Sequence, residues 1–384
     1  MALLNPKKSA IFLLAGDTLP VPTNGFVEVG EELVINPSPT LEEYNRISGK
    51  LGTTDSYTDV CHATFNQTVT HMMRSTNTAA DALDTVPEYG ELLQICAFDE
   101  EVTQTLVFSD TTGLNIGDSL AGDTSSATGT VSIINGTSVT VTGKSVADFQ
   151  AEDLNTGAYT VTAVGDSVLY TNSQTPIRGS GVGYVDGKKY TATDSIVGDA
   201  SFTFEVGKSA SISAALQGFL DNNGVPTNEA NPDVTLNDEP VMIVSCADVL
   251  TAGGSTVQAD MITIEMGADI QELYGIGGLK EFNINDYVIK MTADFYVDSA
   301  DYDNAITKLN NETVEAINIK LGTNQTGELI NGKSVYIVAD FGKANTFSDS
   351  SSEGKVKRSF TWLLRPDAND HNLKILHGYF APAA

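Results

Sequence analysis

The stretch that most constrains the fold of this chain is Thr256–Val297, where two runs of alternating apolar and polar residues follow each other. In the first run, Gln258–Gly267, isoleucine and methionine alternate with polar side chains, and Tyr287–Val297 repeats the pattern. A period of two is typical of a strand with one buried and one solvated face. The connection Tyr274–Gly278 is too long and too rich in glycine for a two-residue turn. The pattern predicts a long β-hairpin that needs neighbours for its edges and its apolar face.

The composition favours a mainly β protein with a real core. Hydrophobic residues make up 41% of the 384 residues, and few segments show a helical period. Those segments are Pro87–Phe98, where proline suits a first helical turn, and Ser299–Leu309. Val185–Lys188 contains Asp-Gly, a strong signal for a hairpin turn. Further strands are expected at Asp59–Met73, Ser201–Val206, Ser209–Leu216, Met242–Cys246, Val314–Leu321, Ser334–Ala339 and Lys355–Leu364.

Charge and cysteine content exclude several functions. The formal net charge is −29, and because binding to phosphates needs lysine and arginine, tight binding of nucleic acid is not expected. The same charge weakens adhesion to anionic membranes. The three cysteines show no pairing pattern, which fits synthesis in a reducing cytoplasm. The apolar run Ile11–Ala15 is far too short to cross a bilayer, so we expect a strand or arm there and no membrane insertion.

The amino-acid composition of the sequence changes between Thr105 and Val164. Long charged side chains become rare, and the glycines Gly117, Gly122, Gly129, Gly136 and Gly143 mark turns at short intervals. This predicts a small β-domain at residues 105–164, inserted into a larger domain made of residues 1–104 and 165–384. The first part of the larger domain begins with a proline-rich arm that contains short strands.

The order of these parts resembles that of bacteriophage tail tube proteins, also called major tail proteins. The likeness is carried by Pro87–Phe98, Asp186–Tyr190 with Ala200–Val206, Ile262–Ile270 and Val356–Leu364, and it covers most of residues 1–104 and 165–384. Residues 105–164 depart from a minimal tube subunit. They resemble the Gly/Thr-rich modules of phage structural proteins, most clearly at Ile116–Asp118 and Ala127–Val131.

The resemblance implies a tail-tube-like β-sandwich or barrel with a flanking α-helix, plus the small inserted β-domain. It implies a virion structural protein whose subunits close into hexameric rings. Stacked rings would form the conduit through which DNA passes during ejection, without tight binding. The further partners that it implies are the tape measure protein and the tail terminator, and the implied location is the virion tail, after assembly in the host cytoplasm. The host and the contractile state of the tail are left open.

Under this interpretation the hairpin is the candidate wall of the lumen. A conduit for DNA must not hold phosphates, so its inner face is expected to carry more acids than bases. The candidate lumen-facing acids are Glu265, Asp269, Glu272 and Asp294. The candidate contacts between rings are the N-terminal arm and the connection Tyr274, Gly275, Ile276, Gly277, Gly278 and Leu279.

No pattern predicts a catalytic, cofactor or metal site, so an enzyme is not expected. Cys61, His62 and His71 could be read as metal ligands, but Cys61 and His62 alternate on opposite faces of a strand and a fourth ligand is missing. Gly179–Gly183 lacks the strand–loop–helix context of a phosphate cradle and predicts a flexible loop. Asp221–Gly224 lacks the downstream glutamate of a Ca²⁺ loop.

Two other classes of function stay open. One is a capsid-decorating or cell-surface β-sandwich in which residues 105–164 form a carbohydrate-binding module. The other is a secreted depolymerase, for which the scattered carboxylates offer no defined pair. Microscopy of the purified protein would separate rings or tubes from monomers or trimers.

Overall fold

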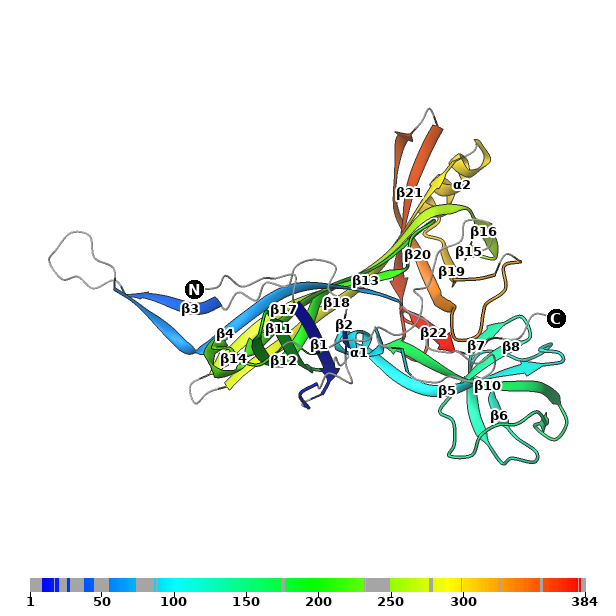
Figure 1. Ribbon diagram of the computed structural model, residues 1–384. Helices are drawn as coiled ribbons and strands as arrows, with labels where there is room; N and C mark the ends of the chain where they lie inside the picture. Colours follow the sequence, from blue (N-terminus) through cyan, green and yellow to red (C-terminus); the bar gives the residue numbers. More distant parts are fainter. Residues whose placement is uncertain are drawn as a thin grey trace.

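The computed structural model describes residues 9–16, 18–20, 26–27, 38–44, 55–73, 86–87, 89–173, 177–230, 232, 249–275, 279–297, 299–324, 326–352, 355–378 and 380. Across these residues the protein is mainly β, as the alternating pattern predicts, with two α-helices, α1 (Tyr89–Ile95) and α2 (Ser299–Asn310) (Figure 1). Both helices lie within segments that show helical spacing. The strand predicted at Met242–Cys246 lies outside the described residues.

The centre of the fold is an antiparallel run of seven strands, in which each strand pairs with the next. In spatial order these are β4 (Asp55–Met72), β13 (Ser211–Leu220), β12 (Lys188–Glu205), β17 (Ala259–Gly275), β18 (Leu279–Tyr296), β21 (Lys355–Arg365) and β20 (Val335–Ser352). Several of these strands are long, and Figure 1 shows them as a twisted band across the molecule. At one end, β3 (Ser38–Tyr44) pairs with the first half of β4, and this hairpin projects from the body.

The predicted long hairpin is present as β17 and β18. The face expected to be apolar is buried, at Ile262, Ile264, Met266, Ile289, Met291 and Ala293. The two strands are longer than the alternating runs, because pairing continues as far as Gly275 opposite Leu279. The predicted connection is therefore shorter than expected, since Tyr274, Gly275 and Leu279 belong to paired strands. Residues 276–278 lie outside the described part of the chain.

Further strands extend this run and share its core. One edge of β20 continues through β22 (Lys374–Gly378), β10 (Tyr159–Asn172) and β5 (Phe98–Phe108), and the other through β19 (Val314–Leu321), β15 (Val249–Ala252) and β16 (Ser255–Val257). β12 also pairs with β14 (Thr227–Asn228) and β11 (Gly179–Val185), which leads to β1 (Ser9–Ala15) and β2 (Phe26–Val27). One continuous core joins these strands, with Phe202 and Met291 from the central run and Tyr170 and Ile375 from the others.

Residues 106–161 have a hydrophobic core of their own, formed by Leu106, Phe108, Leu114, Leu120, Ala127, Val131, Val139, Val141, Phe149, Leu154 and Val161. The strands here are β6 (Ser119–Ala121), β7 (Thr128–Asn135), β8 (Ser138–Thr142) and β9 (Asp153–Leu154), with the ends of β5 and β10. β5 and β10 run on into the main body, so the boundaries expected at 104 and 165 fall inside strands. Ile133 shares a buried hydrophobic cluster with Tyr336, Val338 and Leu376 of the main body. Residues 106–161 therefore pack against the main body.

The prediction of a flexible loop at Gly179–Gly183 is wrong. These residues lie in β11, a fully buried strand between β1 and β12. A Cβ on Gly179 would come within 2.4 Å of Ile95 Cδ1, and one on Gly181 within 3.2 Å of Leu13 Cδ2. The glycines are therefore present because α1 and β1 pack directly onto the backbone of this strand.

Two hairpins show how local and distant signals combine. Val185 pairs with Lys188, and Asp186 and Gly187 between them have φ angles of 45° and 82°, as the predicted Asp-Gly turn requires.

β20 was expected to end at Ala339 but continues to Ser352. Its serine-rich second half pairs with β21, and this pairing overrides a weak intrinsic strand propensity.

No helix in the described part of the chain combines the length and the apolar character needed to cross a membrane.

Candidate functional site

The solvated face of the seven-strand run is rich in small hydroxyl side chains, with exposed Met72, Val288 and Tyr296 among them, and we call it the hydroxyl face. Its central row consists of threonines that are direct cross-strand partners on five neighbouring strands: Thr203, Thr263, Thr292, Thr361 and Thr346. Ser211 continues the row onto β13. The hydroxyls of Thr292 and Thr361 are 3.0 Å apart, which shows that the side chains also touch across the ladder. The alternating period of each strand brings them to one face.

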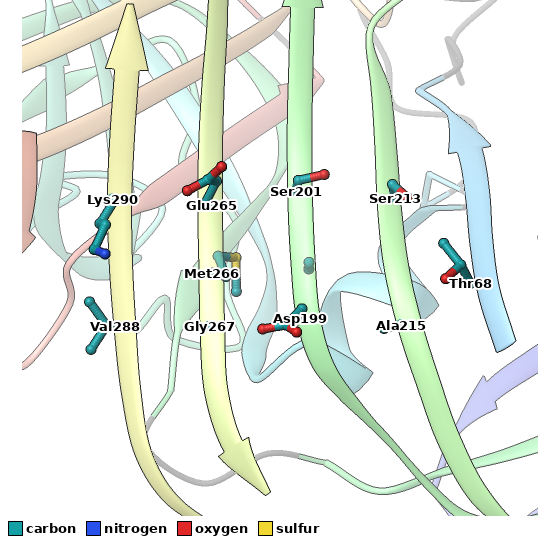
Figure 2. A pocket seen from close by; sticks show the side chains of 11 residues that line it. Thr68, Asp199, Ser201, Ser213, Ala215, Glu265, Met266, Gly267, Val288 and Lys290 are labelled. Atoms are coloured by element: carbon teal, nitrogen blue, oxygen red, sulfur yellow. The ribbon is translucent and has the colours of Figure 1, made fainter. Parts of the chain in front are cut away.

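The next row of the hydroxyl face carries charge. Ser213, Ser201, Glu265 and Lys290 follow each other as cross-strand partners on β13, β12, β17 and β18. Glu265 and Lys290 are both exposed and directly opposite. Figure 2 shows these side chains around a shallow hollow of about 440 Å³, with Asp199 at its edge. The lining of the hollow is mixed, because Met266, Val288 and small residues lie between the polar groups.

Three of the four predicted lumen-facing acids lie on the hydroxyl face. Glu265 and Asp269 are exposed, and Asp294 is partly buried and accepts a hydrogen bond from the Ser359 hydroxyl. The side chain of Glu272 lies outside the described residues. On this face of the hairpin, the described acids Glu265, Asp269, Asp286 and Asp294 outnumber the base Lys290.

One lysine of the neighbouring strand partly offsets these acids. Lys357 Nζ lies 2.9 Å from Asp260 Oδ2 and 3.7 Å from Asp294 Oδ2. The hydrogen bond to Asp260 raises the pKa of the lysine, and the charge of Asp294 adds to this effect. Lys357 is well solvated, so its pairing adds little to stability.

The outer strands of the run present open edges. β13 covers one edge of β4 up to Met72, but β3 covers the opposite edge only up to Thr64. β21 pairs with β20 up to Ser352, whereas β19 reaches only Lys343 on the other side. Within the described residues, residues 65–70 and 345–352 therefore have backbone groups that face no strand, and such edges can pair with another chain.

Buried charges hold the apolar side of the run in place. Arg358 is fully buried, donates to Asp349 at 2.7 and 2.9 Å, and lies over the Phe347 ring. Its hydrogen bonds lower the pKa of Asp349. Glu315 accepts a hydrogen bond from Trp362 Nε1 at 2.8 Å and ion-pairs with Lys308. Lys308, Glu315 and Trp362 line a second hollow, of about 590 Å³, beside α2.

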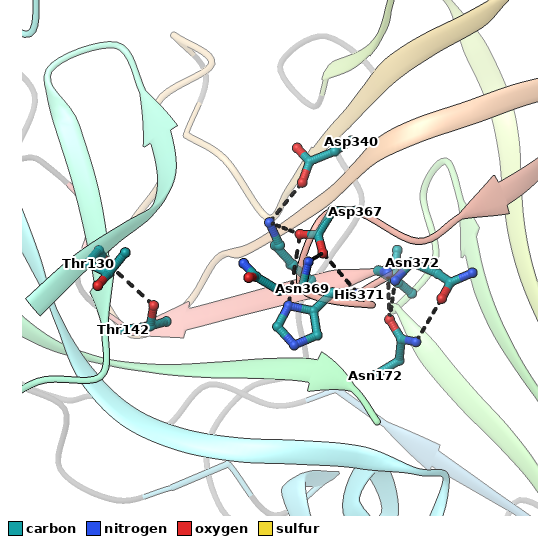
Figure 3. Close-up of polar contacts among 10 residues, drawn as sticks. Thr130, Thr142, Asn172, Asp340, Asp367, Asn369, His371 and Asn372 are labelled. Carbon is teal, nitrogen blue, oxygen red and sulfur yellow. Dashed lines mark hydrogen bonds and ion pairs between the residues drawn. The ribbon is translucent and has the colours of Figure 1, made fainter. Parts of the chain in front are cut away.

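A further buried charge lies where β20 and β22 meet. Lys374 Nζ lies 2.8 Å from both Asp340 Oδ2 and Asp367 Oδ2 (Figure 3). Burial lowers the pKa of Lys374, but hydrogen bonds to the two carboxylates outweigh burial and raise it overall. Burial raises the pKa of Asp367, yet Lys374 and two backbone N–H groups lower it further than burial raises it. The resting state is therefore an ion pair.

The structure does not describe all three of the residues that were considered, and rejected, as metal ligands. The side chains of Cys61 and His62 lie outside the described part of the chain, and His71 is buried. No group of three or more His, Cys, Asp or Glu among the described residues is placed to hold a metal ion.

The sequence patterns did not predict that these threonines form a row. Its members come from five strands spread over Thr203–Thr361, and only the pairing of the strands places them side by side. The available signal was a hydroxyl residue at alternate positions in each strand, which by itself indicates any solvated face.

No protein-family model matches this chain, and no curated protein is detectably similar to it in sequence.

Proposed function

We propose that this protein is a bacteriophage tail tube subunit, a structural virion protein whose copies close into hexameric rings that stack into a conduit for DNA. The observation that carries the proposal is the hydroxyl face, a long antiparallel surface rich in hydroxyl side chains, with open strand edges at both ends of the run. The resemblance in the order of sequence motifs supports the same assignment. This resemblance also implies two partner proteins, the tape measure protein and the tail terminator.

The chemistry of the hydroxyl face suits the wall of such a conduit. Threonine and serine hydroxyls are short and uncharged, so they offer moving DNA no cationic group to hold its phosphates. The acids Glu265, Asp269 and Asp294 add repulsion, which acts over a Debye length of about 10 Å. Lys290 is a direct neighbour of Glu265, so its charge is locally compensated.

The open edges suit the closure of a ring. Residues 65–70 of β4 and 345–352 of β20 lie at opposite ends of the run, so a contact between them in two copies is head-to-tail. Head-to-tail contacts form a closed ring when the rotation between copies closes. The projecting β3–β4 hairpin and the far half of β17–β18 are the parts that reach toward a neighbouring ring (Figure 1).

Electron microscopy of the purified full chain over a range of concentrations tests the proposal. Rings or short tubes are the expected result. Asn66→Lys with Thr68→Lys places two lysines on the open strand β4, and lysine on an edge strand blocks pairing. Thr128→Lys with Thr130→Lys adds the same charge to exposed positions of β7, in the inserted part, and serves as the matched control.

The β4 variant should stay monomeric, and the β7 variant should assemble. Only monomers at every concentration, or a trimer, would contradict the tube assignment. Those results would instead favour a decorating or cell-surface protein with a carbohydrate-binding module.

A further inference from the structure

Lys374, the first residue of β22, is a buried amine held between two carboxylates. Its side chain is 2% exposed, and its Nζ lies 2.8 Å from an oxygen of Asp340 and 2.8 Å from an oxygen of Asp367 (Figure 3). Asp340 lies on β20 and Asp367 in the segment after β21. The β20–β22 ladder, in which Val338 faces Lys374, brings these groups together from separate parts of the chain.

The two carboxylates have different surroundings. Asp367 Oδ1 accepts hydrogen bonds from the backbone N–H groups of Asn369, at 2.8 Å, and His371, at 3.0 Å. These donors hold Oδ1 in place, and Oδ2 is the oxygen that faces the Lys374 ammonium. The described contact of the Asp340 carboxylate is with Lys374, at 2.8 Å. Asp340, which the amine contacts directly, is therefore the carboxyl group that we assign to the new bond.

We propose that Lys374 and Asp340 condense into an intramolecular isopeptide bond, with Asp367 as the proton relay. Asp367 takes one proton from the Lys374 ammonium, and the neutral amine then attacks Cγ of Asp340. One C–N bond forms and one C–O bond breaks. The departing oxygen leaves as water with two protons, one passed on by Asp367 and one from the attacking nitrogen. Asp367 returns to the carboxylate form, and no oxidant or other reactant is needed.

The geometry favours condensation at this place. The amine and the carboxyl group are already in contact, and an intramolecular reaction between held groups is strongly accelerated. A positioned carboxylate can carry the proton. The low exposure of Lys374 keeps bulk water from the amide once it has formed, which slows hydrolysis.

The bond would secure the last described strand of the protein. β22 pairs with β20 on one edge and with β10 on the other, and β10 continues into the core of residues 106–161. A covalent link between β20 and β22 would therefore keep β22 in place as the strand on which β10 pairs. This inference does not depend on the proposed function.

The intact mass of the denatured full chain tests the proposal, followed by a peptide map. The expected protein is lighter than its sequence by one water, about 18 Da, and the map contains a branched peptide that joins Asp340 to Lys374. Lys374→Arg keeps the cation but cannot form this amide, and Asp340→Ala lacks the carboxyl group. Both variants should have full mass. Asp367→Asn should accumulate the uncondensed form.

A wild-type protein of full mass overturns the proposal and leaves an ion pair only. A lost water that persists in Lys374→Arg also overturns it, since an Asp-Gly pair such as Asp186-Gly187 can lose water by forming a succinimide. A lost water that persists in Asp340→Ala shows that the amide uses another carboxyl group.

Discussion

Thr105 and Gly165 are direct cross-strand partners in the β5–β10 ladder, at the point where the chain enters and leaves the core of residues 106–161. Thr105 Oγ1 also lies 2.9 Å from Ser167 Oγ, a contact that stays within the two connecting strands. Because the two ends of the inserted part are neighbours, a two-residue turn can rejoin the main body without a gap.

Replacing Leu106–Val164 by Asn-Gly should therefore leave the main body folded and able to assemble. The variant loses the contact of buried Ile133 with Tyr336 and Leu376, which costs about 1.5–3 kcal/mol. Urea unfolding measures this loss. Ile133→Ala in the full chain removes the same contact without the cut and should destabilise the main body by a similar amount. A main body that does not fold after the replacement would show that residues 106–161 are an integral part of it.

Gly179→Ala should destabilise the protein by about 1–3 kcal/mol, because the new Cβ would overlap Ile95 Cδ1 and the Leu14 carbonyl oxygen. Gly267→Ala is the matched control, since its Cβ would meet only Asp199 Oδ1 at 3.7 Å. That change should alter stability by less than about 0.5 kcal/mol. Combining Gly179→Ala with Ile95→Ala should cost less than the sum of the two single changes. Additive losses would show that the overlap does not decide the cost.

Glu315→Ala should destabilise the protein by about 3–5 kcal/mol, because it leaves the buried Trp362 Nε1 without its acceptor and Lys308 without its carboxylate. Trp362 is the single tryptophan of the chain, so its fluorescence reports both the unfolding transition and the local change. Glu315→Gln keeps an acceptor for Trp362 and should lose less. Equal losses for the two variants would mean that the ion pair to Lys308 outweighs the hydrogen bond to Trp362.

Stability should fall as the pH is lowered from about 6.5 to about 4, because burial lowers the pKa of His377 to about 4 in the folded protein. Between these values the unfolded chain binds a proton that the folded chain does not. The full effect is roughly 3 kcal/mol, and it levels off below the folded-state pKa. His377→Phe, measured by urea unfolding at several pH values, should show a smaller loss over this range than the wild type. Parallel curves would rule out His377 as the cause.

Glu265→Lys should give assembled tubes a measurable affinity for duplex DNA at low salt, where the wild-type tube should show none. The change places a second lysine beside Lys290 on the hydroxyl face, and paired cations bind phosphates with release of counterions. Thr128→Lys with Thr130→Lys makes the same change in net charge on β7 and is the control. Equal binding by both variants, measured by co-sedimentation, would show that the hydroxyl face does not line the conduit.

Much of the architecture follows from signals within single segments. The alternation in Gln258–Gly267 and Tyr287–Val297 correctly predicts which face of the hairpin is buried. The Asp-Gly turn at Val185–Lys188 and the proline-led helix near Tyr89 are also present. These features are determined locally, because side-chain period, backbone φ and the first helical turn depend on residues close together in the chain.

The tertiary structure alone decided which segments meet. By themselves the glycines of Gly179–Gly183 predict a loop. In the structure these residues form a strand that pairs with β1, and α1 and β1 pack directly onto its backbone. The threonine row joins residues 203 to 361, and the Lys374 cluster joins β20, β22 and the segment after β21. Pairing between distant strands is stabilised by cross-strand contacts and burial, and neither quantity is encoded in the period or propensity of any one strand.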